Sequence, residues 1–283
     1  MPVDCSGDST SDDTADDVAD IQRHYVGYAE AEEDRLNRHP IEFTITSRYL
    51  EQYLPPEGHI LEVGCATGRY TVALAQRGHT VTAVDLTPEL VERCEANVRR
   101  GGVESRVSVH VADGRDLSEV PGDDFDAGLI MGPLYHLIRR EDRQLAITQV
   151  VSRLKPGAPF FSAHISRYGA MADVMKKIPD WAEDHDRLEY FMANGHEGDF
   201  HPRNGSFRGY FATPEELPRL HEEAGLETVT VAASDPAGTA VEETFRQLPD
   251  HLKQIWLDVL FRMSAEPSYR GAWCHMLYIG RKP

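Results

Sequence analysis

Residues 60–78 read ILEVGCATGRYTVALAQRG, and residues 80–89 read TVTAVDLTPE. The first stretch joins an apolar run to a turn of small residues at 64–68, which is followed by apolar residues at helical spacing. The second is another apolar run, and it ends in Asp85. This succession of strand, tight turn, helix and acid-ended strand is typical of folds that bind a nucleotide cofactor. Small residues let the backbone approach such a ligand, and a carboxylate accepts hydrogen bonds from its ribose hydroxyls.

The alternation of strands and helices continues on both sides of this stretch. Upstream, two helices are predicted between Ile21 and Leu54 with a break near Pro40, and the second is expected at the edge of the sheet. Short connections between strands and helices favour a mostly parallel sheet with helices on both faces. The further predicted strands are 106–111, 125–131, 159–165, 226–232 and 273–280.

Changes in composition divide the chain into five segments. The first twenty residues hold seven Asp and no Lys or Arg, so we expect a disordered acidic tail. The connection at 166–208 is long, with one predicted helix at 171–178 and a polar, glycine-rich end, so we expect part of a cap. The predicted segments are the tail at 1–20, lid helices at 21–54, a cofactor-binding core at 55–165, the cap insertion at 166–208, and the end of the core at 209–283 with a second helical insertion at about 238–268.

The overall composition excludes some classes of partner. The formal net charge of the 283 residues is −18, so the chain repels phosphate backbones and nucleic acid is not an expected partner. No apolar run approaches the ~20 residues that span a bilayer, and the first residues lack the basic and apolar regions of a secretory signal. The four cysteines are scattered without C-x-x-C spacing, which argues against a zinc site or a disulfide framework and favours the cytoplasm.

The small-residue turn also carries a family resemblance. The two-residue step from Gly64 to Ala66 to Gly68, preceded by Glu62, resembles the first motif of class I S-adenosylmethionine-dependent methyltransferases. Ala66 stands where that motif has its middle glycine, and alanine is tolerated there if its φ stays negative.

Other motifs extend the resemblance over about residues 55–165. The second and third predicted strands end in acids, Asp85 and Asp113, and the fourth ends in GPLYHL at 132–137. With a Tyr-rich helix upstream and YFATPEEL at 210–217, the chain resembles a subgroup of small-molecule methyltransferases that contains GPLYHL. The resemblance implies a Rossmann-like, seven-stranded sheet whose last strand is antiparallel, with a helical cap from the N-terminal helices and the two insertions.

The resemblance implies S-adenosyl-L-methionine as cofactor and S-adenosyl-L-homocysteine as product. For Asp113, a carboxylate that only caps a turn is the alternative. The implied contacts are Gly64, Ala66 and Gly68 against the methionine and ribose, Glu62 toward the methionine amino group, Asp85 on the ribose hydroxyls, Asp113 facing the adenine amino group, Leu86 and Gly114 flanking the ring, and Met131 beneath the methionine.

The first predicted helix carries aromatic and charged residues at three- and four-residue steps. Tyr25, Tyr28, Glu32 and Arg35 share one face of it. Such a face suits a lid over a sulfonium and an amino-acid end, with Tyr25 and Arg35 on the cofactor and Tyr28 on the acceptor. An exposed amphipathic helix with Glu–Arg pairs is the equally weighted alternative.

The end of the fourth predicted strand faces the position of the transferred methyl group. We expect Tyr135 to shape the methyl site and His136 to act as a general base or to orient the acceptor, because imidazole titrates near neutrality. Alternatively, His136 caps the following helix or satisfies a hydrogen bond in the core. Further candidates for contacts with the acceptor are His164, Arg167, Tyr168 and Phe211.

The expected activity is metal-independent methyl transfer to a small-molecule acceptor by direct in-line displacement. No carboxylates cluster at the ends of the fourth and fifth predicted strands, so no metal is expected. The alternatives are a nucleotide-dependent oxidoreductase, a domain that binds the cofactor without turnover, and a protein or RNA methyltransferase with an open cleft. The identity of the acceptor, the atom methylated and the oligomeric state stay open.

Overall fold

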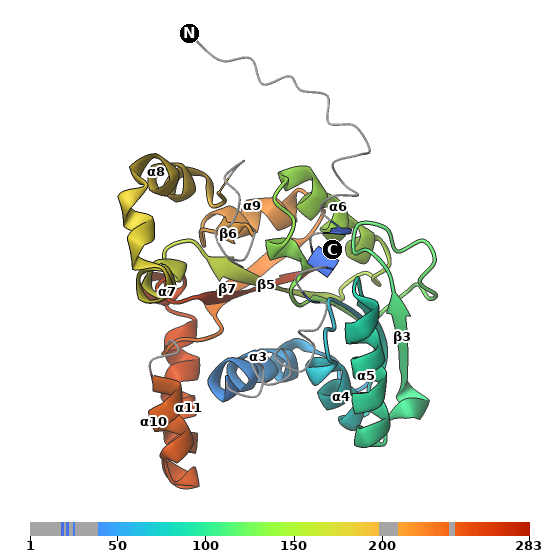
Figure 1. Ribbon diagram of the computed structural model, residues 1–283. Coiled ribbons are helices and arrows are strands. Elements are labelled where there is room, and N and C mark those ends of the chain that lie inside the picture. Colours follow the sequence, from blue (N-terminus) through green and yellow to red (C-terminus); the bar gives the residue numbers. More distant parts are fainter. Residues whose placement is uncertain (1–17, 20, 23–24, 26–38, 198–208, 238–240) are drawn as a thin grey trace.

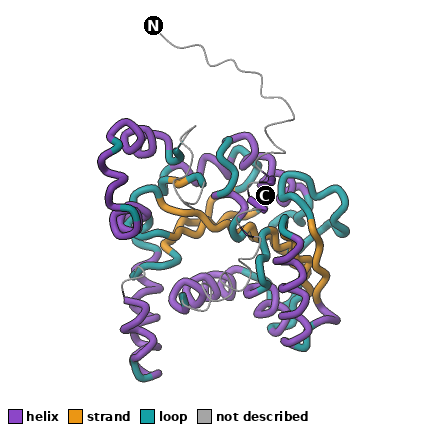
Figure 2. Tube along the Cα trace, viewed as in Figure 1, coloured by secondary structure: helices purple, strands orange, loops and turns teal. Residues whose placement is uncertain are grey.

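A computed structural model describes residues 18–19, 21–22, 25, 39–197, 209–237 and 241–283. Within this part of the chain an eight-stranded sheet lies between two layers of helices (Figures 1 and 2). The strands are β1 (His59–Val63), β2 (Thr80–Asp85), β3 (Val107–Val111), β4 (Ala127–Ile130), β5 (Pro159–Ser166), β6 (Phe211–Ala212), β7 (Glu227–Ala233) and β8 (His275–Arg281). The α-helices are α3 (Pro40–Tyr53), α4 (Arg69–Gln76), α5 (Pro88–Gly101), α6 (Arg140–Ser152), α7 (Ala170–Lys177), α8 (His185–Asn194), α9 (Glu216–Glu222), α10 (Glu242–Gln247) and α11 (Asp250–Ser264). Short 3₁₀ turns lie at η1 (Glu104–Arg106), η2 (Pro133–Tyr135), η3 (Pro179–Glu183) and η5 (Pro267–Tyr269).

The strand order sets which ends of the strands meet. The order is β3-β2-β1-β4-β5-β8-β7, and the two-residue β6 pairs with β5 outside this path. Strands β3, β2, β1, β4 and β5 are parallel, whereas β8 is antiparallel to both β5 and β7. Strand β7 therefore runs in the direction of β5, and their carboxyl ends lie at one edge with those of β1, β2 and β4. The predicted mostly parallel sheet with an antiparallel last strand is confirmed; the extra strand is β6.

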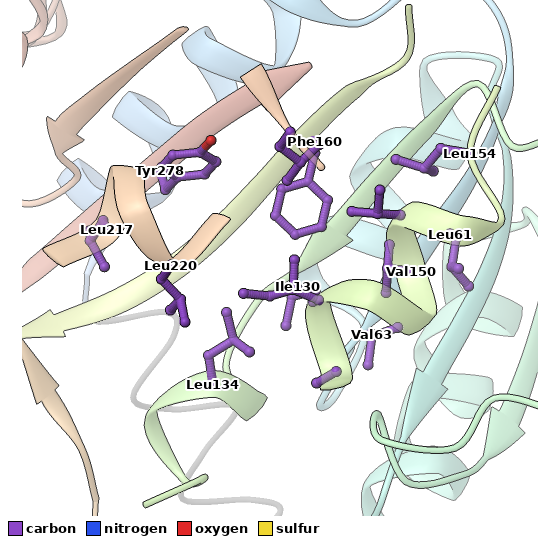
Figure 3. Close-up of a cluster of buried hydrophobic side chains, with 14 of the residues drawn as sticks. Leu61, Val63, Ile130, Leu134, Val150, Leu154, Phe160, Leu217, Leu220 and Tyr278 are labelled. Atoms are coloured by element: carbon purple, nitrogen blue, oxygen red, sulfur yellow. The ribbon is translucent and has the colours of Figure 1, made fainter. Parts of the chain in front are cut away.

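Alternate residues of the buried strands build two cores. Leu61 and Val63 of β1 pack with residues of α6 and α9 on one face (Figure 3). Ile60 of the same strand packs on the other face with residues of α3, α4, α5 and α11. In Figure 1, α6 and α9 accordingly lie above the sheet, and α3, α4 and α5 lie below it. Because both faces are covered, nearly every residue of β1, β2 and β4 is buried.

Helix α3 corrects one prediction from the sequence. It was placed at the sheet edge, but its buried residues, among them Ile41, Ile45 and Leu50, belong to the core on one face of the sheet. Helix α11 packs against α3, where Arg48 and Asp258 form an ion pair of 2.8 Å and Tyr49 Oη lies 2.8 Å from Ser264 Oγ. The second insertion therefore covers α3.

The first insertion contains more helix than the sequence pattern predicts. Helix α7 is close to the predicted 171–178, but η3 and α8 follow it. The Asp184 side chain accepts a hydrogen bond from the Arg187 N–H and so caps α8. Trp181 and Phe191 pack edge to face at 5.3 Å between ring centroids. No helix in the described ranges combines the length and apolar character needed to cross a membrane.

A chain of buried polar side chains crosses the core beside β5. Ser162 Oγ lies 2.9 Å from His164 Nε2 and 2.8 Å from His221 Nε2, and the His221 ring stacks on Tyr278 at 3.7 Å. His221 Nδ1 lies 2.7 Å from the Leu217 carbonyl oxygen. Burial disfavours the imidazolium form, so it lowers the pKa of His164 well below its usual range and that of His221 to about 3.

This network predicts a loss of stability in acid. The folded pKa of His221 lies below that of the unfolded chain, so the unfolded state binds more protons between the two values and stability falls as pH drops below about 6.5. Replacing the imidazole in His221→Gln should shrink the difference in unfolding free energy between pH 7 and pH 5 by about 1–2 kcal/mol. Urea denaturation at both pH values measures it. His251→Gln, at an exposed position of α11, serves as control and should keep the wild-type difference; an unchanged difference in His221→Gln would contradict the prediction.

Candidate functional site

A cavity lies at the edge of the sheet where the parallel strands end. Its empty space is about 930 Å³, open solvent at the mouth included. Its lining comes from the loops after β1, β2, β3 and β4 and from Ile21 and Tyr25 of the N-terminal segment. Among the described residues of the two insertions, none lines this cavity. Their contribution to a cap stays a prediction.

The turn after β1 forms the floor of the cavity. The N–H groups of Gly64 and Cys65 both donate to the Val84 carbonyl oxygen, at 2.7 and 3.0 Å, and so tie the turn to β2. Gly64 has φ 80°, and a Cβ atom there would lie 2.2 Å from Cδ of Pro133. Glycine at 64 therefore lets the loop after β4 pack directly on the loop after β1.

Ala66 departs from the conformation expected of it. Its φ is +47°, in the left-handed region, so the condition of a negative φ is not met. A non-glycine residue is strained there by about 1–2 kcal/mol, because Cβ crowds the following carbonyl. The Ala66 N–H donates to Asp85 Oδ2 at 2.9 Å. This hydrogen bond holds the strained residue in place.

Asp85 lines the cavity and organises two loops at once. Its Oδ2 accepts from the Ala66 N–H and its Oδ1 from the Thr87 N–H at 3.0 Å. These two backbone hydrogen bonds orient the Asp85 carboxylate at the cavity. Leu86 and Thr87, the next two residues, also line the cavity.

Asp113 lines the cavity on the side of β3 and is held by Arg115. The Arg115 guanidinium contacts both carboxylate oxygens at 2.6–3.1 Å, and the Arg115 N–H donates to Oδ1 at 2.9 Å. Arg115 also lies 3.5 Å from Asp142 of α6. Asp113 thus caps its turn, as one of the two alternatives expects, and it also faces the cavity beside Gly114.

Glu62 and Gly68 are not among the residues that line the cavity. Glu62 is 1% exposed and accepts a hydrogen bond from Thr71 Oγ1 at 2.6 Å, while its Oε1 has no hydrogen-bond partner within the described residues. Burial raises its pKa to about 7, since desolvation disfavours the carboxylate. Gly68, with φ 86°, begins α4 against Cys94. Both residues support the turn from behind.

The loop after β4 forms the wall of the cavity that faces the loops after β2 and β3. Met131, Gly132, Tyr135 and His136 line the cavity there. Tyr25 Oη lies 2.9 Å from His136 Nε2, and the two rings meet edge to face at 5.5 Å. Helix α6 has no side-chain cap at its start, so His136 does not serve as that cap.

The N-terminal segment bridges the two sides of the cavity. Gln22 Nε2 donates to the Leu86 carbonyl oxygen at 3.1 Å, on the side of β2. Tyr25, three residues later, contacts His136 on the side of β4. Tyr28 and Arg35, predicted on the same helix, lie outside the described residues.

The four further candidates for acceptor contacts lie elsewhere in the described structure. His164 is 3% exposed within the network of Ser162 and His221. Arg167 is buried, pairs with Glu216 at 2.7 Å and donates to three carbonyl groups. Tyr168 is 52% exposed, and Phe211 packs on Phe191.

Sequence reasoning missed other residues that line the cavity, among them Arg69, Tyr70 and Arg115. Their positions in the sequence could have indicated this, because Arg69 and Tyr70 begin the helix directly after the turn and Arg115 follows the acid-ended third strand. Within the described ranges, no group of three His, Cys, Asp or Glu side chains is arranged to hold a metal ion.

Known proteins resemble this chain in sequence and in fold. Residues 60–157 match the model of a family described as a methyltransferase domain. Over 120 residues the chain is 34% identical to the ubiquinone biosynthesis O-methyltransferase of Xanthomonas axonopodis pv. citri, an alignment that covers 42% of this chain and 48% of that protein. The chain thus spans about half the length of the curated relatives it matches.

Solved structures share the fold over most of the chain. The 1,6-didemethyltoxoflavin-N1-methyltransferase of Burkholderia thailandensis, with 1,6-didemethyltoxoflavin and S-adenosylhomocysteine bound, has a TM-score of 0.57 at 16% identity and covers 100% of this chain and 94% of its own. Magnesium protoporphyrin IX methyltransferase of Synechocystis, with S-adenosylhomocysteine bound, has a TM-score of 0.58 at 10% identity and covers 94% and 100%. Residues 60–157 therefore resemble a methyltransferase domain, and the chain shares the Rossmann-like fold of these two methyltransferase structures.

The strained turn predicts a stabilising substitution. Ala66→Gly removes the Cβ atom that disfavours φ +47° but adds freedom to the unfolded chain, so we expect a net gain of about 0.5–1 kcal/mol in unfolding free energy. Ala112→Gly, in the loop after β3 where φ is not positive, is the matched control and should lose about 0.4–1 kcal/mol. Urea denaturation distinguishes them. A loss at position 66 as large as that at 112 would show that the left-handed turn stores no strain.

Proposed function

We propose that this protein transfers a methyl group from S-adenosyl-L-methionine to a small-molecule acceptor, without a metal. The observation that carries the proposal is the cavity at the carboxyl edge, with the turn and Asp85 on one wall and Tyr135 and His136 on the other. Bound S-adenosyl-L-methionine would supply an electrophilic methyl group on a sulfonium sulfur. Everything else required is positioning, removal of water and, for some acceptors, removal of a proton.

The residues on the side of β1 to β3 suit the cofactor. The backbone at Gly64 and Ala66 offers a close approach for the methionine and ribose, and Asp85 is oriented to accept the ribose hydroxyls. Leu86 and Gly114 line the cavity where an adenine ring would lie between β2 and β3, and Asp113 lies at its rim. Met131 would lie beneath the methionine. Glu62, behind the turn, is a buried acidic group that would act on the methionine amino group through the turn or a water molecule.

The residues after β4 suit the acceptor side. The contact with Tyr25 fixes the ring of His136 at the cavity wall. In the tautomer that carries its proton on Nε2 and donates to Tyr25 Oη, the Nδ1 atom of His136 is the one that can take a proton. Tyr135 would shape the space around the methyl group. Tyr25 would act as part of a lid, since it contacts His136 and Gln22 nearby contacts Leu86.

A small-molecule acceptor is supported by several independent features. The relatives named above are, by their names, an O-methyltransferase of ubiquinone biosynthesis and methyltransferases of 1,6-didemethyltoxoflavin and of magnesium protoporphyrin IX. The charge of −18 disfavours nucleic acid. Gln22 and Tyr25 also contact Leu86 and His136, on two sides of the cavity, which favours an enclosed site. On the basis of the GPLYHL segment that follows β4, we assign the chain to the subgroup of small-molecule methyltransferases that contains this motif.

Binding of S-adenosylhomocysteine tests the cofactor assignment. By calorimetry we expect tight binding to the wild type and none for NAD, whereas NAD binding would favour the oxidoreductase alternative. Asp85→Asn removes the charge that accepts the ribose hydroxyls, so affinity should fall about tenfold to a hundredfold. Asp123→Asn, at a side chain 79% exposed, is the control and should bind like the wild type. Equal affinity of Asp85→Asn and wild type would remove Asp85 from the cofactor site.

Turnover tests the role of His136. In an assay of S-adenosylhomocysteine formation with a panel of small phenols, thiols and amines, His136→Ala should lower kcat about 10²–10⁴-fold and leave the affinity for S-adenosylhomocysteine unchanged. Tyr25→Phe removes only the hydroxyl that orients His136 and should have a smaller effect on kcat. An unchanged kcat in His136→Ala at saturating acceptor would exclude His136 as the general base. Absence of turnover with every acceptor would favour the alternative that this domain binds the cofactor without catalysis.

A further inference from the structure

Three carboxylates from three different elements converge at the same edge of the sheet, beyond the cavity. Glu42 lies in the first turn of α3, Asp235 follows β7, and Glu242 begins α10. His275 Nδ1, at the start of β8, lies 3.4 Å from Glu42 Oε2 and 3.7 Å from Asp235 Oδ2. His39, just before α3, lies 3.9 Å from Glu242. We refer to these five residues as the acid cluster.

Two of these carboxylates are buried, and each has one oxygen without a hydrogen bond within the described residues, although His275 Nδ1 lies 3.7 Å from that of Asp235. Asp235 is 5% exposed and Glu242 is 6% exposed. Asp235 Oδ1 accepts from the His275 N–H at 2.9 Å, but Asp235 Oδ2 and Glu242 Oε2 have no hydrogen-bond partner within the described residues. A buried acceptor left in this state is costly, and more so when it is charged. These oxygens therefore point to a donor that the described part of the chain does not supply.

Charge in the cluster is also unbalanced. Desolvation first, and then the neighbouring carboxylates, raise the pKa of Asp235 and of Glu242 to about 7. His275 opposes this at Asp235, and a hydrogen bond from the Ile41 backbone and the charge of Arg246 oppose it at Glu242. Burial raises the pKa of the Cys274 thiol, next to His275. Asp173 and Lys177 of α7 also act electrostatically on this thiol. A cation placed among the carboxylates would restore their charged form and satisfy the orphaned oxygens.

The acid cluster lies one side chain away from the cavity. Glu42 acts electrostatically on Tyr70, whose ring lines the cavity. Phe43, next to Glu42, packs on that ring at 5.2 Å between centroids. Asp235 and His275 lie at the carboxyl edge of the sheet, because β7 runs parallel to β5 and β8 begins where β5 ends. None of the five cluster residues lines the cavity itself, so an acceptor would reach the cluster past the Tyr70 side chain.

We propose that the acid cluster binds a cationic group, an ammonium or guanidinium, carried by the methyl acceptor at a position separate from the methylated atom. The inference rests on the proposed methyltransferase function and adds the substrate class. An ammonium has no lone pair, so the cation is a recognition group, and a second nucleophilic atom of the acceptor faces the methyl group. Donors on the cation would reach Asp235 Oδ2 and Glu242 Oε2, the two oxygens that lack partners.

The test compares three probes that share one ring and differ in charge. With the protein saturated in S-adenosylhomocysteine, benzylamine, benzyl alcohol and benzoate are titrated and their dissociation constants are read from the melting temperature. We expect benzylamine to bind about tenfold or more tightly than benzyl alcohol, and benzoate to bind least. The advantage of benzylamine should grow as pH rises through about 7, because the cluster carboxylates lose their protons there.

Matched variants locate the effect. Asp235→Asn and Glu242→Gln keep the shape of the side chain and should remove most of the preference for benzylamine without changing the binding of S-adenosylhomocysteine. Glu243→Gln, next to Glu242 with a side chain 68% exposed, should keep the wild-type preference.

The outcomes separate this inference from the proposed function. Equal binding of benzylamine and benzyl alcohol by the wild type, or an undiminished preference in both Asp235→Asn and Glu242→Gln, would overturn the cationic-acceptor inference alone. Failure of the wild type to bind S-adenosylhomocysteine would instead overturn the methyltransferase proposal.

Discussion

The hydrogen bonds accepted by Asp85 are the constraint on which the cavity depends. One carboxylate holds both the N–H of Ala66, in a strained left-handed conformation, and the N–H of Thr87, at the start of the next loop. Asp85 thereby links the loops after β1 and β2 across the floor of the cavity. Because the chain's own N–H groups occupy part of its acceptor capacity, the carboxylate is oriented before any ligand arrives, and little ordering remains to oppose binding.

Close backbone approach extends this constraint to the opposite wall. Gly64 has no Cβ, so Pro133 packs directly on the turn and brings Tyr135 and His136 to the cavity. Tyr25 then closes the arrangement from the N-terminal segment through its contact with His136. These two contacts join parts of the chain that are far apart in sequence. A change at Gly64 would therefore displace the loop after β4 and the turn together.

Local sequence patterns predict the secondary-structure elements well, but they do not predict contacts between residues that are far apart in sequence. The strands at 60–63, 80–84 and 159–165 were predicted to within one residue, because continuous apolar runs mark strands that are buried on both faces. The φ of Ala66 depends on Asp85, nineteen residues away, and so was not predictable from its own neighbours. Helix α8 was hidden by the polar residues around it. The meeting of Glu42 with Asp235 and His275 depends on the pairing of β7 with β8, whose register no periodicity reveals.

Three buried carboxylates of the described structure each have an oxygen without a hydrogen bond. The middle of β1 and β4 is almost entirely apolar, yet Glu62 near the end of β1, Asp235 after β7 and Glu242 of α10 each bury an oxygen without a partner in the described structure. All three carboxyl groups have a pKa raised to about 7, so desolvation leaves them partly protonated near neutrality. A fold selected for stability alone would replace such groups with apolar side chains. Their retention at one edge of the sheet is the pattern expected when local stability is given up for a binding site.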